Sequence, residues 1–156
     1  MSANRRFLLV RRPNGTPVPE DFSLVTEAIP AAPAGGFVVR NHYVSLDPAQ
    51  RGWMDDAPSY MPPIPLGDPV RATTVGVVET SANPDFAPGD WVLGLNALED
   101  YSQVQPGGFT SKIDVSQVDS PSRFLSAMGA VGLTAYFGLL EDGRPQAGET
   151  LLVSGA

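Results

Sequence analysis

The chain has 156 residues, 42% of them hydrophobic and 17% charged, and a formal net charge of −7. Its 16 glycines and 16 prolines argue against a helical bundle, because these residues are the least favourable in a helix interior. The absence of cysteine excludes disulfide and thiolate chemistry, and the acidic balance argues against nucleic acid as the main partner. No apolar run approaches the roughly 18 residues of a membrane span, and the N-terminus has no secretory signal, so we expect a cytoplasmic location without a membrane partner.

Short apolar segments, separated by turn residues, predict strands throughout the first 115 residues. These segments are 5–12, 22–29, 37–46, 70–81, 91–95, 101–104 and 110–115. The segment 37–46 has apolar residues on both faces, so we expect that strand to be largely buried. Short strands at regular spacing are typical of a sandwich or barrel.

A long segment without strand character, 49–68, interrupts this pattern. It contains four prolines together with Trp53, Tyr60 and Met61. Loops of this length are uncommon inside compact domains unless they are functional or disordered. Its aromatic and sulfur-containing side chains favour a functional loop.

The sequence changes character after residue 120. Ser122 can cap a helix that begins at Arg123, and apolar residues then recur at helical spacing as far as Glu141. Gly132 predicts a break, so we expect two short helices. The apolar segment 150–154 predicts a strand, and a helix followed by such a strand is typical of the opening of a βα unit. We therefore expect the chain to be a fragment of a longer protein.

Four stretches, in this order, resemble the zinc-independent medium-chain dehydrogenase/reductases, in the branch of the prostaglandin, alkenal and curcumin reductases. They are 43–54 (YVSLDPAQRGWM), 86–92 (FAPGDWV), 132–140 (GLTAYFGLL) and 148–156 (GETLLVSGA). The resemblance implies a mainly β fold. Residues 1–121 would form a GroES-like, partly open β-barrel that serves as the catalytic domain. Residues 122–156 would form two short connecting helices and the first strand of a truncated Rossmann domain.

The resemblance also implies an activity. An enzyme of this branch uses NADPH to reduce the C=C bond of an α,β-unsaturated carbonyl such as an enone, an alkenal or a curcumin-like compound. Hydride goes to the β-carbon, a proton goes to the α-carbon, and negative charge collects on the carbonyl oxygen as an enolate, where a hydrogen-bond donor accelerates the step. We expect a homodimer for the full-length enzyme, and an inactive fragment that binds NADPH poorly.

Tyr60 is the candidate catalytic residue. Relatives that resemble curcumin reductase have a tyrosine in the corresponding loop that faces the active site. The Tyr60 hydroxyl could donate to the substrate carbonyl, or its ring could stack on a flat enone; the alternative is a surface tyrosine packed on Pro62. Many relatives have a second tyrosine where this chain has Ala49, so any role of that tyrosine is absent here or taken by Tyr60.

The candidate cofactor-binding residues are Asp47, Ala130, Thr134 and Gly155. In the family the turn at Asp47 lies beside the nicotinamide, and the alternative is a plain Asp-Pro turn. In relatives, the residues at the positions of Ala130 and Thr134 approach the nicotinamide carboxamide. We expect the Thr134 hydroxyl, at a helix break, to be free for a ligand rather than bonded to its own turn. The alternative is that Thr134 caps the second helix. Gly155 would begin the glycine-rich turn that approaches the pyrophosphate.

No metal site is expected, because a catalytic zinc needs three protein ligands and the chain has one histidine and no cysteine. We expect His42, the lone histidine, to be a structural residue. We expect Arg51 to form a salt bridge, and the acidic residues Glu99 and Asp100 to be solvated in a loop. Two other functions stay open: a quinone reductase of the same superfamily, and a GroES-like binding or assembly module without catalysis.

Overall fold

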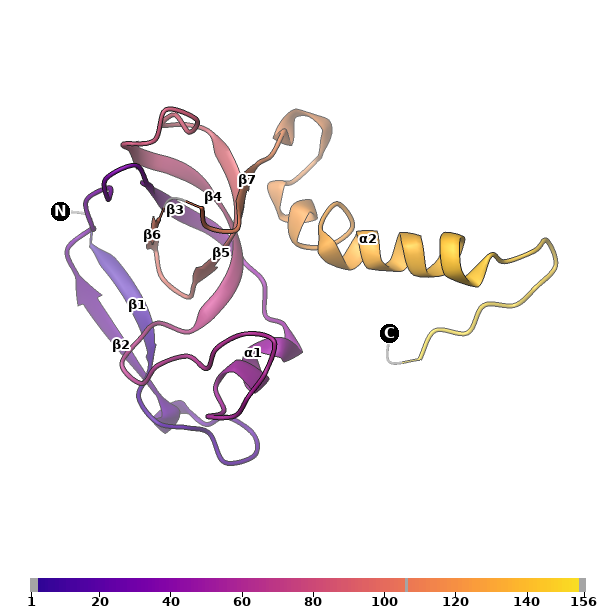
Figure 1. The fold of residues 1–156 in the computed structure, drawn as a ribbon, viewed down its shortest axis with the longest axis horizontal. Coiled ribbons are helices and arrows are strands. Elements are labelled where there is room, and N and C mark those ends of the chain that lie inside the picture. Colours follow the sequence, from indigo (N-terminus) through magenta and orange to yellow (C-terminus); the bar gives the residue numbers. More distant parts are fainter. Residues whose placement is uncertain (1–2, 106, 155–156) are drawn as a thin grey trace.

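The computed structural model describes residues 3–105 and 107–154, and its fold is mainly β (Figure 1). Seven strands lie in these ranges: β1 (Asn4–Leu9), β2 (Phe22–Glu27), β3 (Phe37–Val44), β4 (Arg71–Ser81), β5 (Trp91–Ala97), β6 (Tyr101–Val104) and β7 (Thr110–Lys112). Each of the segments expected to form a strand before residue 116 overlaps one of them. The prediction of a mainly β fold is confirmed.

The strands form two antiparallel sheets. β1 pairs with β2, and the other five are ordered β6-β3-β4-β5-β7. Backbone hydrogen bonds join the sheets outside the strand ladders: the Phe7 N–H donates to the Leu98 carbonyl, and the Val70 N–H donates to the Phe7 carbonyl, both at 2.9 Å. Along β1 the barrel is therefore closed by hydrogen bonds to irregular segments near residues 70 and 98. Among the described residues, no continuous strand ladder closes it there, so the barrel is partly open.

The buried half of β3 runs from Phe37 to Val39, whereas Tyr43 and Val44 are each 37% exposed. The prediction of a largely buried strand is therefore wrong for the second half of β3. β6 pairs with β3 only as far as Arg40, and the register of β3 against β4 shifts at His42. Beyond this point β3 has lost one of its two neighbouring strands, so its apolar side chains are covered less.

A chain of side-chain hydrogen bonds crosses the barrel interior from β5 to β1. In order, it joins Asn96, Thr74, Asn41, Ser102, Glu99 and Arg6, with donor–acceptor distances between 2.7 and 2.9 Å. Thr74 and Ser102 are 0% and 2% exposed, and the Glu99 side chain is 9% exposed. Buried polar groups need such partners, and these link the two sheets where backbone pairing is sparse.

The segment expected to be a long loop begins with a helix, α1 (Pro48–Trp53). Proline suits the first helical position because the N–H that it lacks has no intrahelical partner there. The Gln50 side chain accepts the Asp47 N–H at 3.1 Å and so satisfies a second donor at the start of α1. The helix–loop boundary therefore falls near Met54, later than expected.

The C-terminal part, residues 121–154, projects from the barrel as an arm (Figure 1). It consists of a 3₁₀ turn (Pro121–Leu125), the helix α2 (Ala130–Phe137) and a wider π-helical continuation (Gly138–Gly143). The cap of the first turn is Ser120, whose Oγ accepts the Ser122 N–H, so the prediction of a cap at Ser122 is wrong. No helix in the described ranges is long and apolar enough to cross a membrane.

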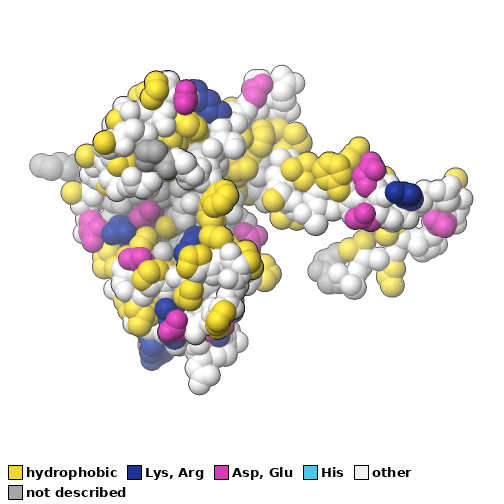
Figure 2. All heavy atoms as spheres, viewed as in Figure 1, with side chains coloured by type: hydrophobic (Ala, Val, Ile, Leu, Met, Phe, Trp, Pro, Cys, Tyr) yellow, Lys and Arg dark blue, Asp and Glu magenta, His cyan; other side chains and the backbone are white. Residues whose placement is uncertain are grey.

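Apolar side chains lie over the surface of the arm (Figure 2). Val131, Leu133 and Tyr136 on α2 are 54–61% exposed, and Leu152 is 89% exposed. Residues 150–153 are not in a strand, so the prediction of a strand over 150–154 is wrong for this chain. A strand needs a neighbour to bond its backbone, and no described strand lies beside these residues.

Candidate functional site

The loop that follows α1, Met54–Ile64, presents Tyr60 to solvent. Tyr60 is 77% exposed, and the structure gives its hydroxyl no hydrogen-bond partner among the described residues. Its ring lies edge-on to Trp53, with ring centroids 6.3 Å apart and an interplanar angle of 68°. A phenol in this setting has both its hydroxyl and much of its ring available to a ligand.

Asp47 lies immediately before α1 and is half-buried. The start of α1 is held by Gln50, whose side-chain amide donates to the Ser45 carbonyl at 3.3 Å and to the Arg71 carbonyl at 3.1 Å. Three hydrogen bonds of one glutamine thus fix the turn at Asp47 against β4. Sequence reasoning did not single out Gln50, although its position three residues after Asp47 is the signature of a capping residue.

Arg51, expected to be a salt-bridge partner, pairs with Asp55 at 2.6 Å. Its guanidinium also donates to the carbonyls of Gly15 and Pro13, at 2.8 and 3.2 Å. Arg51 therefore holds the turn after β1 against α1, and its donors are already engaged within the protein.

Ala130 and Thr134 lie one turn apart on α2, and both are exposed. The Thr134 hydroxyl donates to the Ala130 carbonyl at 2.7 Å, so the prediction of a hydroxyl not bonded to its own turn is wrong. The predicted break at Gly132 is also wrong, because α2 runs through it. A Cβ on Gly132 would collide with the Ala127 carbonyl oxygen, so this glycine permits a close backbone contact instead of ending the helix.

The candidate residues lie in two groups. Asp47 and Tyr60 flank α1 at one end of the barrel, whereas Ala130 and Thr134 lie on the projecting arm (Figure 1). Within the part of the chain that the structure describes, no hydrogen bond joins one group to the other. Gly155 lies outside the described residues.

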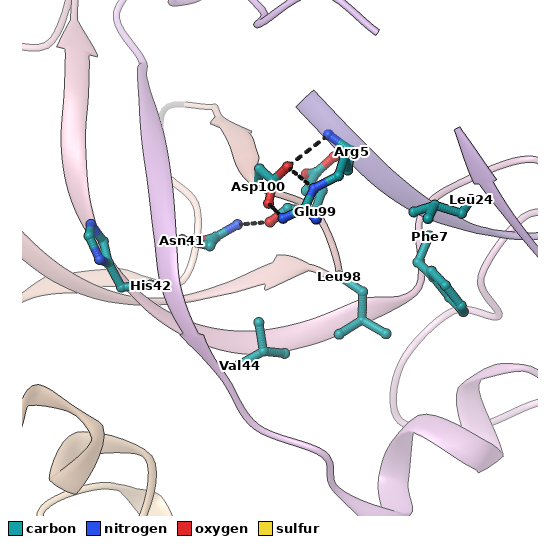
Figure 3. A pocket seen from close by; sticks show the side chains of 9 residues that line it. All are labelled: Arg5, Phe7, Leu24, Asn41, His42, Val44, Leu98, Glu99 and Asp100. Atoms are coloured by element: carbon teal, nitrogen blue, oxygen red, sulfur yellow. Dashed lines mark hydrogen bonds and ion pairs between the residues drawn. The ribbon is translucent and has the colours of Figure 1, made fainter. Parts of the chain in front are cut away.

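A pocket of about 410 Å³ that sequence reasoning missed lies where the two sheets meet (Figure 3). Phe7, Leu24 and Leu98 form part of its apolar lining, and Arg5 and Asp100 are among its polar residues. Arg5 donates to Asp100 at 2.8 and 3.0 Å, and this hydrogen bond lowers the pKa of Asp100. The signal in the sequence was the basic pair Arg5 and Arg6 and the acidic pair Glu99 and Asp100. The fold brings these two pairs together although they lie far apart along the chain.

The prediction that Glu99 and Asp100 are solvated is wrong for Glu99, whose side chain is 9% exposed and pairs with Arg6 at 2.9 Å; the Asp100 side chain pairs with Arg5 and is 32% exposed. The lone histidine, His42, is exposed and packs its ring 5.3 Å from that of Trp91. Among the described residues, no three His, Asp or Glu side chains gather as a metal site would require. The lining of the pocket in Figure 3 includes none of the candidate site residues.

Residues 5–112 match the family described as the N-terminal domain of oxidoreductase. The chain belongs to this oxidoreductase family. It is 42% identical over 153 residues to the NADPH-dependent curcumin reductase of Escherichia coli (strain K12), covering 98% of this chain and 44% of the relative. It is 33% identical over 158 residues to the 2-alkenal reductase (NADP(+)-dependent) of Nicotiana tabacum, covering 99% of this chain and 46% of that relative.

Among solved structures, CurA in complex with NADPH from Vibrio vulnificus superposes with a TM-score of 0.80 at 38% identity. That match covers 93% of this chain and 42% of the CurA chain. The predicted resemblance to the N-terminal part of the curcumin and alkenal reductases, in the medium-chain dehydrogenase/reductase superfamily, is confirmed. The chain spans less than half the length of these relatives.

Proposed function

We propose that this chain is the substrate-side domain of an NADPH-dependent oxidoreductase that reduces the C=C bond of α,β-unsaturated carbonyls. The observation that carries the proposal is the 42% identity, over 98% of the chain, to a protein named NADPH-dependent curcumin reductase. The second relative, named a 2-alkenal reductase, supports the same substrate class. Curcumin and 2-alkenals share a C=C bond conjugated to a carbonyl, which is the group to be reduced.

We propose two functional parts within the chain, a catalytic domain at 1–121 and a connecting part at 122–156. The family match ends at residue 112, and the helical arm begins at Pro121. The exposed apolar side chains of the arm support this division, because they do not belong to the barrel core.

Tyr60 is proposed to contact the substrate. NADPH, when bound, supplies a hydride to the β-carbon of the enone. The resulting negative charge would fall on the carbonyl oxygen, where the Tyr60 hydroxyl, which has no described protein partner, can donate. A proton at the α-carbon completes the saturated carbonyl. The exposed ring of Tyr60 is suited to stack on a flat conjugated substrate.

Thr134 fits a role beside the nicotinamide carboxamide as a hydrogen-bond acceptor. Its proton is engaged with the Ala130 carbonyl at 2.7 Å, which leaves the hydroxyl lone pairs for an incoming N–H. Thr134 is exposed, so a ligand can reach it. Asp47, held in the turn before α1, is proposed to line the same cofactor.

The test uses an enzyme of the relatives' length with this chain as its N-terminal part, termed the long enzyme below. We expect it to oxidise NADPH with a simple enone and to release the saturated ketone, identified by proton NMR. Oxidation of NADPH with quinones but not with enones would overturn the proposal in favour of a quinone reductase. Light scattering and cell fractionation test the further proposals of a homodimer and a cytoplasmic location.

A further inference from the structure

The Tyr60 loop, Met54–Ile64, is closed at its two ends by a single arginine. Arg12, from the segment after β1, donates through Nη1 to the Met54 carbonyl at 2.8 Å and to the Ile64 carbonyl at 2.6 Å. Beside it, the Ile64 N–H donates to the Trp53 carbonyl at 2.8 Å. The two ends of the loop are therefore joined by charge-assisted bonds, which are stronger than neutral ones.

A second arginine holds the loop close to Tyr60. Arg71, the first residue of β4, donates through Nη1 to the Pro62 carbonyl at 3.0 Å. Its guanidinium also lies over the Trp53 ring, 5.6 Å from the ring centroid. Trp53 in turn meets the edge of Tyr60. Arg71 thus contacts both Trp53, which meets the edge of the Tyr60 ring, and the loop backbone two residues after Tyr60.

The residues beneath the loop are packed in the barrel core. Trp53, Met54 and Ile64 are 8%, 6% and 1% exposed, and they belong to one apolar cluster with Leu9 and Val70. The indole N–H of Trp53 is buried without a partner in the described protein, so packing and the cation above the ring fix its orientation. The ends of the loop are therefore in the core while its tip is in solvent.

We propose that Arg12 and Arg71 are positioning residues, which hold the Tyr60 loop in one conformation so that the phenol is already placed when substrate arrives. This inference rests on the proposed function of Tyr60. A loop that is ordered before binding does not lose that conformational freedom on binding. A displacement of about 1 Å at a reacting group can cost as much as 100-fold in rate, so a loosened loop affects catalysis without any lost contact to substrate.

The first test measures the loop alone, in the 156-residue chain. Arg12→Met keeps the length of the side chain and removes the donors, and Arg12→Lys restores charged donors. The matched control is Arg123→Met, which removes only an exposed ion pair to Asp119. We expect hydrogen exchange of the Ile64 amide to be about 10-fold faster in Arg12→Met, largely restored in Arg12→Lys, and unchanged in the control. An Ile64 amide that exchanges equally in Arg12→Met and the control overturns the proposal.

The second test measures the consequence for catalysis, in the long enzyme. We expect Arg12→Met and Arg71→Met to lower kcat/KM for an enone about 10-fold relative to Arg123→Met, measured well below the melting temperature of each variant because the carbonyls that lose their donor also lower stability. Lowered melting temperatures with unchanged kcat/KM assign both arginines to stability alone and overturn the proposal. Tyr60→Ala is measured beside them: wild-type kinetics in that variant refute the role of Tyr60, which separates failure of the proposed function from failure of the positioning.

Discussion

Thr74 lies within the series of side-chain hydrogen bonds that crosses the barrel, and the effect of removing its hydroxyl can be predicted directly. Its hydroxyl donates to Asn41 Oδ1 at 2.7 Å and accepts from Asn96 Nδ2 at 2.8 Å, and the residue is 0% exposed. Thr74→Val keeps the shape of the side chain and leaves both asparagine groups without this partner. A buried polar group that loses its partner costs about 1–3 kcal/mol. Because both asparagines are only half-buried, we expect a total loss of about 2–4 kcal/mol in the free energy of unfolding.

The assay is urea unfolding followed by tryptophan fluorescence, with Thr80→Val as the control. Thr80 lies on the same strand, β4, but is exposed, and such surface changes are usually worth less than about 0.5 kcal/mol. The urea midpoint should fall in Thr74→Val with little change in the slope of the transition. Equal midpoints for the two variants would refute the conclusion that the polar chain stabilises the barrel.

Four further predictions concern the site and the charges. Tyr60→Phe should lower kcat for a simple enone about 100-fold in the long enzyme, as the loss of one donor to a developing oxyanion does. If kcat is instead unchanged in Tyr60→Phe and KM is raised in Tyr60→Ala, the ring contributes by stacking alone. Thr134→Val should raise the KM for NADPH because an acceptor is lost, and an unchanged KM would remove Thr134 from the cofactor site. The 156-residue chain alone should bind NADPH weakly, and micromolar binding by calorimetry would contradict this. Hydrogen bonds from the Val18 N–H and from Arg11 lower the pKa of Asp21. Its contribution to stability should therefore be complete above the ordinary aspartate pKa and be lost as the pH falls through the lowered value. Asp21→Asn should flatten the dependence of the urea midpoint on pH between about 5 and 2, and a dependence as steep as in the wild type would contradict the assignment.

The strands were predictable because their signals are local. Apolar and β-branched residues between turn residues located β1 to β7, and only the ends differed by a few residues. The burial of β3 was overestimated because it depends on where β6 ends and where the register shifts, and neither is written in the sequence of β3 itself. α1 was missed because its six residues are too few to show helical periodicity.

The candidate site was only partly accessible to the same reasoning. The position of Tyr60 on a loop followed from the prolines around it, but the arginines that hold the loop did not. Arg12 lies 42 and 52 residues from the two carbonyls that it joins, and no local pattern connects them. Thr134 was expected to be free because Gly132 suggested a break; the glycine instead serves a close contact with Ala127, which only the tertiary structure specifies.

The pairing of the first strand with residues near position 100 has a consequence for synthesis. Asn4 exchanges two hydrogen bonds of 2.9 Å with the backbone of Tyr101, 97 residues later. At about 5–20 residues per second, a ribosome needs about 5–20 s to reach that point. β2 covers one edge of β1 early, and residues 67–70 later bond to Phe7 and Leu9 on the other edge, but the part of that edge at Asn4 and Arg5 waits for residues 100 and 101. Arg5 and Arg6 place charge on this part of the strand, and charged side chains oppose pairing with other chains. We therefore expect the same two arginines to oppose pairing with other chains in the unfinished barrel, before they pair with Asp100 and Glu99.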